Sequence, residues 1–132
     1  MAGMLWDMPD QPLTSDWPAS VHPPGSDSFE QTALDWLFDQ VPADYRLHGV
    51  LRRHPVALSR LARQYVLATL EAAREGYRTA RVDLRDHLSP HALDQVMNAY
   101  LAEGRRTAGV LRSVEAVDGA LRAAAPERSD HE

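Results

Sequence analysis

Residues 55–85 read PVALSRLARQYVLATLEAAREGYRTARVDLR, and this stretch has the pattern of one long amphipathic helix. At about 100° per residue, apolar and small side chains recur at steps of three and four and form one broad side. That side, which we expect to face the core, consists of Leu58, Leu61, Ala62, Tyr65, Val66, Thr69, Ala73, Gly76 and Ala80. Pro55 suits the first helical position, where its missing N–H is not needed. We predict a helix from Pro55 to about Ala80, roughly 40 Å long.

The opposite side of this helix carries arginines within a sector about 60° wide. They are Arg60, Arg63, Arg74, Arg78, Arg81 and Arg85, and we call them the arginine stripe. Val56, Leu67 and Leu70 interrupt the stripe as an apolar waist, and only Glu71 opposes its charge from within the sector. Because a purely solvated face does not need apolar side chains, the stripe is a candidate binding surface. The alternative is a solvated face paired with the acidic helices around it.

The formal charge of −5 is unevenly distributed along the 132 residues. Residues 1–45 contain eight acidic and no basic residues, residues 46–85 contain nine arginines and three acids, and residues 86–132 contain five arginines and eight acids. The three segments therefore carry −8, +6 and −3. Such asymmetry indicates an interaction surface or an intramolecular pairing.

The composition excludes several kinds of chemistry. The chain has no cysteine, so disulfides, thiolate nucleophiles and zinc ribbons are excluded, and it has no lysine, which excludes Schiff-base catalysis and the P-loop. No apolar run reaches the roughly 18 residues of a membrane span, and the first residues lack the pattern of a signal peptide. We expect a soluble, cytoplasmic protein that does not bind membranes.

Residues 1–27 are acidic and contain five of the nine prolines, a composition that predicts an extended or disordered tail. Leu5, Trp6, Met8 and Trp17 lie in this tail, within the pieces LWDMP and SDWP. Acidic-aromatic pieces of this kind are typical of short docking motifs. The tryptophans either bind a partner or fold back onto the chain's own helices, and the sequence leaves both arrangements open.

Two shorter helices are expected before the long one. The first covers residues 29–41, with Ser28 as N-cap, Gln31 in capping-box position and Pro42 at its end. The second covers residues 43–53 and connects the first helix to the long one.

After a loop at residues 82–88, Ser89 and Pro90 are expected to begin another long helix. Its apolar residues keep a helical phase to about Ala123, which favours one unbroken helix. The alternative is two helices divided near residues 104–107.

The predicted fold is all-α, a small bundle built on a long antiparallel helix hairpin with the shorter N-terminal helices packed across it. Residues 28–123 form the domain, and residues 124–132 form a polar C-terminal tail. Small residues are expected to let the two long helices approach closely. They are Ala62, Ala68, Ala72, Ala73, Gly76 and Ala80 on one helix, and Gly104 and Ala108 on the other.

No pattern of catalytic or metal-binding residues is found. Asp83, Asp86, His87 and His91 have the side chains of a zinc or iron site, but Ser89-Pro90 separates the histidines and prevents an i, i+4 pair on one helix. The motifs GxSxG, GxGxxG and HExxH do not occur. We expect no metal, no cofactor, no catalytic residue and no enzymatic activity.

We therefore expect a non-enzymatic protein–protein interaction module, an adaptor or regulator with an acidic protein partner. The candidate binding residues are Arg60, Arg63, Leu67, Leu70, Arg74, Arg78, Arg81, Arg85, Trp6 and Trp17. The alternative is a nucleic-acid-associated regulator that binds phosphates through the stripe, although a sequence pI near 5.6 argues against it.

Two further expectations concern how this surface is covered. We expect a homodimer, because Leu67, Leu70 and Tyr77 would otherwise remain exposed. We also expect the N-terminal tail to occupy the arginine stripe when no partner is bound, since the tether holds it nearby at high effective concentration. The tail residues concerned are Asp7, Asp10 and Asp16, with Trp6 and Trp17 against the apolar waist.

Overall fold

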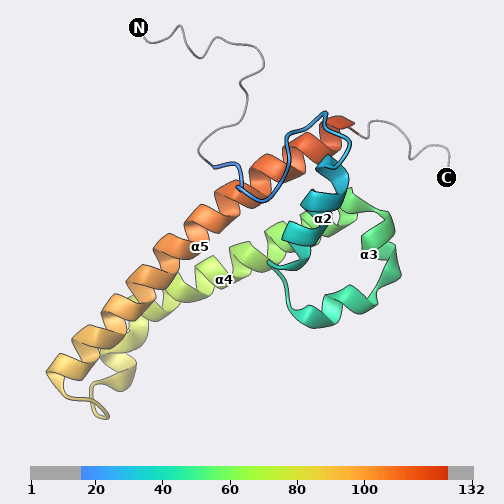
Figure 1. The fold of residues 1–132 in the computed structure, drawn as a ribbon. Helices are drawn as coiled ribbons and strands as arrows, with labels where there is room; N and C mark the ends of the chain where they lie inside the picture. Colours follow the sequence, from blue (N-terminus) through green and yellow to red (C-terminus); the bar gives the residue numbers. More distant parts are fainter. Residues whose placement is uncertain (1–15, 125–132) are drawn as a thin grey trace, which may run out of the picture.

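All regular secondary structure in the computed structural model, which describes residues 16–124, is helical (Figure 1). The elements are α2 (Phe29–Phe38), the 3-10 helix η1 (Ala43–Leu47), α3 (Gly49–Arg53), α4 (Pro55–Leu84) and α5 (Pro90–Ala124). The prediction of an all-α bundle is confirmed. None of these helices is long and apolar enough to pass through a membrane.

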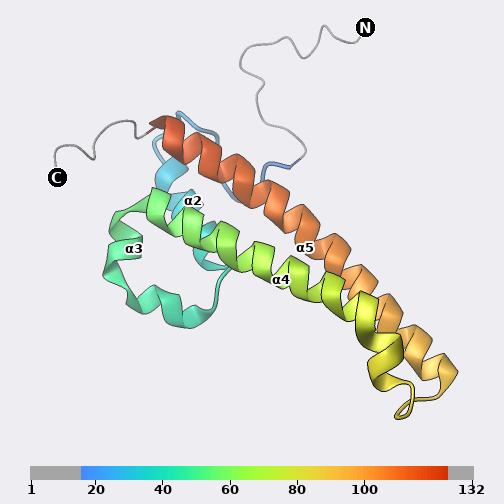
Figure 2. The same cartoon turned by 180° about the vertical axis from the view of Figure 1, so that it is seen from behind.

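The two longest helices, α4 and α5, lie side by side as an antiparallel hairpin (Figures 1 and 2). The 30 residues of α4 span about 45 Å and end at Leu84, beyond the predicted end at Ala80. Ser89 caps α5 as predicted, since its Oγ accepts a hydrogen bond of 3.1 Å from Ala92 N. Helix α5 continues unbroken to Ala124, so the favoured single helix is confirmed.

Small residues bring the two helices together at fewer positions than predicted. Gly76 does so, because a Cβ there would lie 2.2 Å from Tyr100 Cε1. Gly104 does not, because a Cβ there would meet no atom within 4 Å. Of the interface alanines predicted on α4, Ala62, Ala73 and Ala80 are buried, and Ala68 and Ala72 are exposed.

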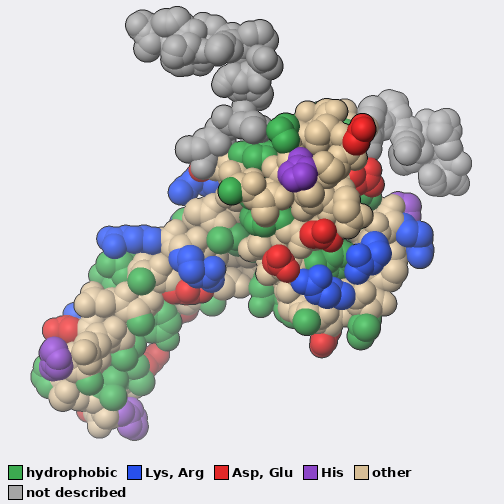
Figure 3. All heavy atoms as spheres, in the orientation of Figure 1, with side chains coloured by type: hydrophobic (Ala, Val, Ile, Leu, Met, Phe, Trp, Pro, Cys, Tyr) green, Lys and Arg blue, Asp and Glu red, His purple; other side chains and the backbone are tan. Residues whose placement is uncertain are grey.

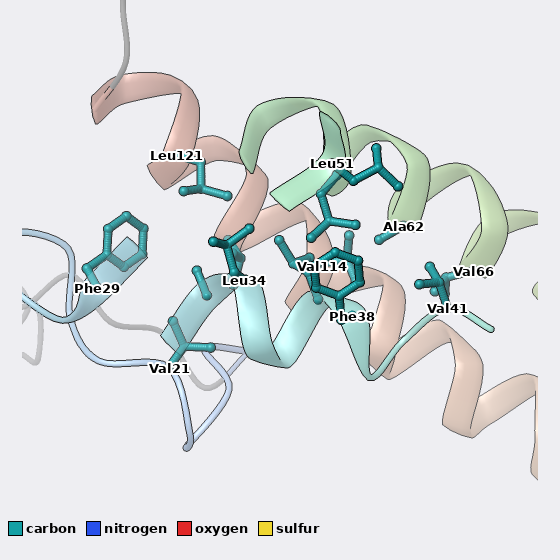
Figure 4. Close-up of a cluster of buried hydrophobic side chains, with 14 residues drawn as sticks. Val21, Phe29, Leu34, Phe38, Val41, Leu51, Ala62, Val66, Val114 and Leu121 are labelled. Carbon is teal, nitrogen blue, oxygen red and sulfur yellow. The ribbon is translucent and has the colours of Figure 1, made fainter. Parts of the chain in front are cut away.

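The main hydrophobic core lies at the open end of the hairpin, where α2 packs across α4 and α5 (Figure 4). Its largest fully buried apolar side chains are Leu37 and Phe38 of α2, Leu58 of α4, and Val114 and Val117 of α5. Helix α2 is apolar around more than half of its circumference, which explains why it contacts both long helices. Among the described residues, the other end of the hairpin consists of α4 and α5 alone (Figure 1).

A buried hydrogen bond also joins the long helices in this core. Ser59 of α4 is fully buried, and its Oγ donates to Asp118 Oδ1 of α5 over 2.5 Å. The same carboxylate accepts from Arg122 Nε on the solvent side. Leaving a buried polar group without its partner costs about 1–3 kcal/mol, so this pair favours one register of the hairpin.

The chain that precedes α2 lies against α2 and α5. Trp17 stacks on Phe29 with ring centroids 6.1 Å apart, and its Nε1 donates to Val21 O over 2.8 Å. Val21 belongs to the main core. Ser113 Oγ of α5 donates to Asp16 O over 2.6 Å. Trp17 therefore adopts the second of its two predicted arrangements, folded onto the chain's own helices.

The predicted capping box at the start of α2 is wrong. The Ser28 side chain makes no hydrogen bond to the helix and bonds instead to His22 Nδ1, while Gln31 Nε2 donates to Asp35 Oδ1. Ser28 does occupy the N-cap position, but its backbone, φ −100° and ψ 8°, is not in the extended conformation usual for a residue whose side chain caps a helix. Helix α2 ends at Phe38, before the predicted end at residue 41.

Two short helices, η1 and α3, replace the single helix predicted over residues 43–53. His48 separates them with an extended backbone, φ −93° and ψ 99°. Leu47, beside it, is 84% exposed. Arg52 of α3 lies over the Phe38 ring, with its guanidinium carbon 4.9 Å from the ring centroid, which holds this connection against α2.

Candidate interaction surface

The arginine stripe runs along α4 as predicted, but four of its six arginines have a carboxylate partner. The pairs are Arg63 Nε with Glu115 Oε2 at 3.1 Å, Arg74 Nη1 with Glu71 Oε2 at 3.0 Å, Arg78 with Glu75, and Arg81 Nη2 with Asp94 Oδ1 at 3.0 Å. Arg60 and Arg85 form no ion pair with any residue in the range 16–124. The stripe is therefore less positive than the sequence alone predicts.

Carboxylates from outside the sector of the stripe, in addition to Glu71, pair with its arginines. Glu75 lies one helical turn before Arg78, a spacing that the sequence already shows. Asp94 and Glu115 belong to α5, so their pairing depends on the register of the hairpin. All of these pairs are exposed, so each contributes about 0.2–1 kcal/mol at most and weakens in salt.

The apolar waist is not an exposed feature of the stripe. Leu70 is only 3% exposed, and Leu67 and Val56 are half-buried. On an ideal helix Leu70 lies about 20° from Arg63 and Arg81, at the edge of the stripe nearest the core side. Both of these arginines pair with residues of α5, so α5 runs along this edge and covers Leu70. The expectation that Leu70 stays exposed in a single chain is wrong.

An open groove of about 370 Å³ lies between α4 and α5, farther along the hairpin than the main core. It is lined by Leu70, Ala73, Arg74, Tyr77 and Arg78 of α4 and by Tyr100, Leu101, Gly104, Arg105 and Ala108 of α5. Apolar and aromatic side chains thus meet three arginines in one hollow. In Figure 3, hydrophobic and arginine side chains lie side by side along the part of the hairpin that extends beyond the main core.

Small residues account for the hollow. Ala73, Gly104 and Ala108 contribute little or no side chain to the lining. A Cβ built at Gly104 would have no neighbouring atom within 4 Å, so the space there is open. Larger side chains flank it, including Tyr77, which is 43% exposed, and Leu101, which is 37% exposed. Within residues 16–124 no third helix packs here, so α4 and α5 cover these side chains and leave part of them exposed.

The arginines of α5 differ in how they are held. Arg106 donates from Nη2 and Nε to the Glu103 carboxylate over 2.7 and 3.0 Å. These hydrogen bonds lower the pKa of Glu103 and raise the pKa of Arg106. Its neighbour Arg105, which lines the groove, forms no ion pair within the described part of the chain. The groove therefore offers one guanidinium that no carboxylate of its own helix engages.

The groove brings together only some of the predicted binding residues. It contains Leu70, Arg74 and Arg78, whereas Arg60 and Arg63 lie nearer the main core and Arg81 and Arg85 nearer the turn of the hairpin. The prediction missed the contribution of α5, made by Tyr100, Leu101, Gly104, Arg105 and Ala108. The available signal was the spacing of Leu101, Arg105 and Ala108, which places all three on one side of a helix.

The N-terminal residues predicted to cover the stripe lie elsewhere where the structure describes them. Trp17 packs on Phe29 of α2, and the Asp16 carboxylate lies 3.3 Å from Arg112 Nε of α5. The predicted docking of these two residues on the stripe is therefore wrong. Trp6, Asp7 and Asp10 lie outside the described residues, as does the predicted C-terminal tail beyond Ala124.

The acidic and histidine residues near the hairpin turn were the candidates for a metal site. Within residues 16–124, no three His, Asp or Glu side chains gather closely enough to hold a metal ion. The candidate residues Asp83, Asp86, His87 and His91 are therefore not grouped as a metal site in the described structure.

Comparison of the chain with protein-family models, with curated proteins and with solved structures finds no significant match.

Proposed function

We propose that this protein is a non-enzymatic protein–protein interaction module, an adaptor or regulator, whose groove between α4 and α5 binds an acidic segment of a partner protein. The observation that supports the proposal is the groove itself. It combines an apolar, tyrosine-containing lining with three arginines, one of which has no carboxylate partner among the described residues.

An acidic segment with an apolar anchor matches both properties of the groove. An aromatic or aliphatic side chain placed over Tyr77, Tyr100 and Leu101 would remove their exposed apolar surface from water, at about 25 cal/mol per Å². A carboxylate beside Arg105 would form a charge-assisted hydrogen bond. At Arg74 and Arg78 an incoming carboxylate must compete with neighbouring glutamates, so we expect Arg105 to contribute most to specificity.

A nucleic acid is the weaker candidate for this surface. Phosphates would have to compete with the carboxylates that already face four arginines of the stripe, and the net charge of −5 opposes the approach of a polyanion. Titration of fluorescent duplex and single-stranded probes at low salt measures this directly. Binding that weakens steeply with added salt would favour the nucleic acid over the protein partner.

We also propose that the protein is a homodimer in the cytoplasm, although fewer of the predicted apolar side chains are exposed to form its interface. Leu70 is covered by α5, so the exposed apolar side chains left for a second copy include Leu47, Val50, Tyr65 and Tyr77. The absence of cysteine agrees with a reducing compartment. Light scattering at micromolar concentration tests the dimer, and a mass of 14.7 kDa would contradict it.

Site-specific crosslinking in the cells that produce the protein tests the groove. A photoreactive phenylalanine analogue replaces Tyr77, and in a matched control it replaces Tyr65, which is 41% exposed on α4 but does not line the groove. We expect an adduct with a protein other than this chain from position 77 that is absent from position 65. Arg105→Glu should abolish the adduct, and Arg106→Glu should leave it in place. Equal adducts from both positions, or none from position 77, would refute the proposal.

A further inference from the structure

The geometry points to an occupant of the groove within the same chain, namely residues 5–10, LWDMPD. This inference rests on the proposed function, because it uses the same groove as the binding site. It differs from docking on the arginine stripe by residues 1–27, since Asp16 and Trp17 are held on α5 and α2 and only the residues before them are left to reach the groove.

The composition of residues 1–15 matches the lining of the groove. Leu5, Trp6 and Met8 supply apolar anchors, Asp7 and Asp10 supply carboxylates, and no arginine occurs before residue 46. The groove offers the complementary set, tyrosine rings and aliphatic side chains beside arginines. A tryptophan is the side chain that most often supplies the anchor energy of such a contact.

The described structure places the start of this segment beside the groove. The Asp16 backbone carbonyl accepts from Ser113 Oγ over 2.6 Å, and its carboxylate lies 3.3 Å from Arg112 Nε. The chain that precedes residue 16 therefore begins at a fixed point on α5, about one helical turn from Ala108 at the end of the groove.

The same side of α5 leads from this point along the groove. Ala108, Arg105 and Leu101 precede Arg112 by steps of four, seven and eleven residues, which keep one side of a helix. Leu101 lies about 16 Å from Arg112 along the helix axis. The ten residues from Trp6 to Asp16 can span up to about 33 Å, so Trp6 reaches any part of the groove.

Tethering makes even weak contacts effective. A short linker gives the tethered segment an effective concentration of about millimolar at the groove, so a millimolar intrinsic affinity fills about half of the sites. A partner then binds only the open fraction of molecules. If the segment occupies the groove nine-tenths of the time, the apparent affinity for a partner falls about tenfold.

Paramagnetic relaxation on the full-length chain tests this inference. The chain has no cysteine, so Gln11→Cys gives a single site for a spin label close to the proposed contact. We expect the label to broaden the amide signals of Gly104, Arg105 and Ala108 more than those of Ala68 and Ala72, which are exposed and do not line the groove. Arg105→Glu should remove this broadening, and Arg106→Glu, at a position paired outside the groove, should retain it.

A mixed sample separates this chain from a second copy. Isotope-labelled protein without the spin label is mixed with spin-labelled protein without the isotope. The comparison sample is protein in which each chain carries both the isotope and the spin label. Broadening in that sample but not in the mixture supports the intramolecular contact. Groove broadening of equal strength in the mixture assigns the occupant to a second copy and overturns the inference, as does absence of broadening in both samples. A groove adduct in the crosslinking experiment would still support the proposed function in that last case.

Discussion

Gly76 occupies a position in α4 where a side chain has no room. A Cβ at this position would lie 2.2 Å from Cε1 and 2.4 Å from Cζ of Tyr100, so the ring would have to move. In an exposed helix, Gly→Ala stabilises by about 1 kcal/mol. Here overpacking, which typically costs about 1–3 kcal/mol, outweighs that gain. We expect Gly76→Ala to lower the free energy of unfolding by about 1 kcal/mol, measured by urea denaturation.

Gly119 of α5 is the matched control for this change. It is exposed, and a Cβ there would meet no atom within 4 Å. Gly119→Ala should therefore raise the free energy of unfolding by up to about 1 kcal/mol through helix propensity alone. If both substitutions stabilise the protein, Tyr100 does not pack against Gly76 as the structure shows.

The position of a residue around its own helix was predicted well from the sequence. Its burial and its ion-pair partner were predicted poorly where they depend on a second helix. The positions of the stripe arginines on α4 follow from the 3.6-residue period alone. The burial of Leu70 and the pairing of Arg63 with Glu115, 52 residues away in sequence, depend on where α5 lies. A single-helix projection contains no information about that neighbour.

The described chain before α2 is part of the fold. Trp17 is half-buried, stacks on Phe29 and donates a hydrogen bond to Val21 O. A fully buried tryptophan cut to alanine costs about 3–5 kcal/mol, so we expect Trp17→Ala to lower the free energy of unfolding by about 2 kcal/mol. Leu47→Ala is the control, since Leu47 is 84% exposed and its truncation should change stability by less than about 0.5 kcal/mol. Equal effects of the two substitutions would mean that this segment adds nothing to the core.

The starts of the long helices were easier to predict than the caps of the short one. Pro55, and Ser89 followed by Pro90, mark helix starts through their own backbone chemistry, and the structure confirms both. The capping box at Ser28 does not form, because the Ser28 backbone is not extended and its hydroxyl lies against His22, six residues earlier. Local signals decide an element boundary only where no tertiary partner competes for the same group.

The hairpin was predictable from the sequence, but the groove was not. Two long amphipathic helices with a short link must fold back on each other, and the apolar breadth of α2 predicts contact with both. The groove results from the uneven distribution of these elements, with α2, η1 and α3 all at one end of the hairpin (Figure 1). Its lining also requires the register that sets Leu70 and Tyr77 opposite Leu101 and Arg105. Neither the register nor the placement of α2 follows from helical periodicity.

The proposed partner and residues 5–10 would occupy the same groove. If residues 5–10 compete with a partner, reversing their charge in the full-length chain should open the groove. We expect Asp7→Arg with Asp10→Arg to increase the partner adduct formed at position 77 several-fold, up to about tenfold where the segment occupied nine-tenths of the molecules. This increase in adduct should be smaller in high salt, because added ions already weaken the contact between residues 5–10 and the groove in the unaltered chain. The control is Asp44→Arg with Asp86→Arg, two exposed positions without an ion pair in the described structure, which change the net charge by the same amount. An increase of equal size in the control would show that net charge, and not the release of this segment, controls access to the groove.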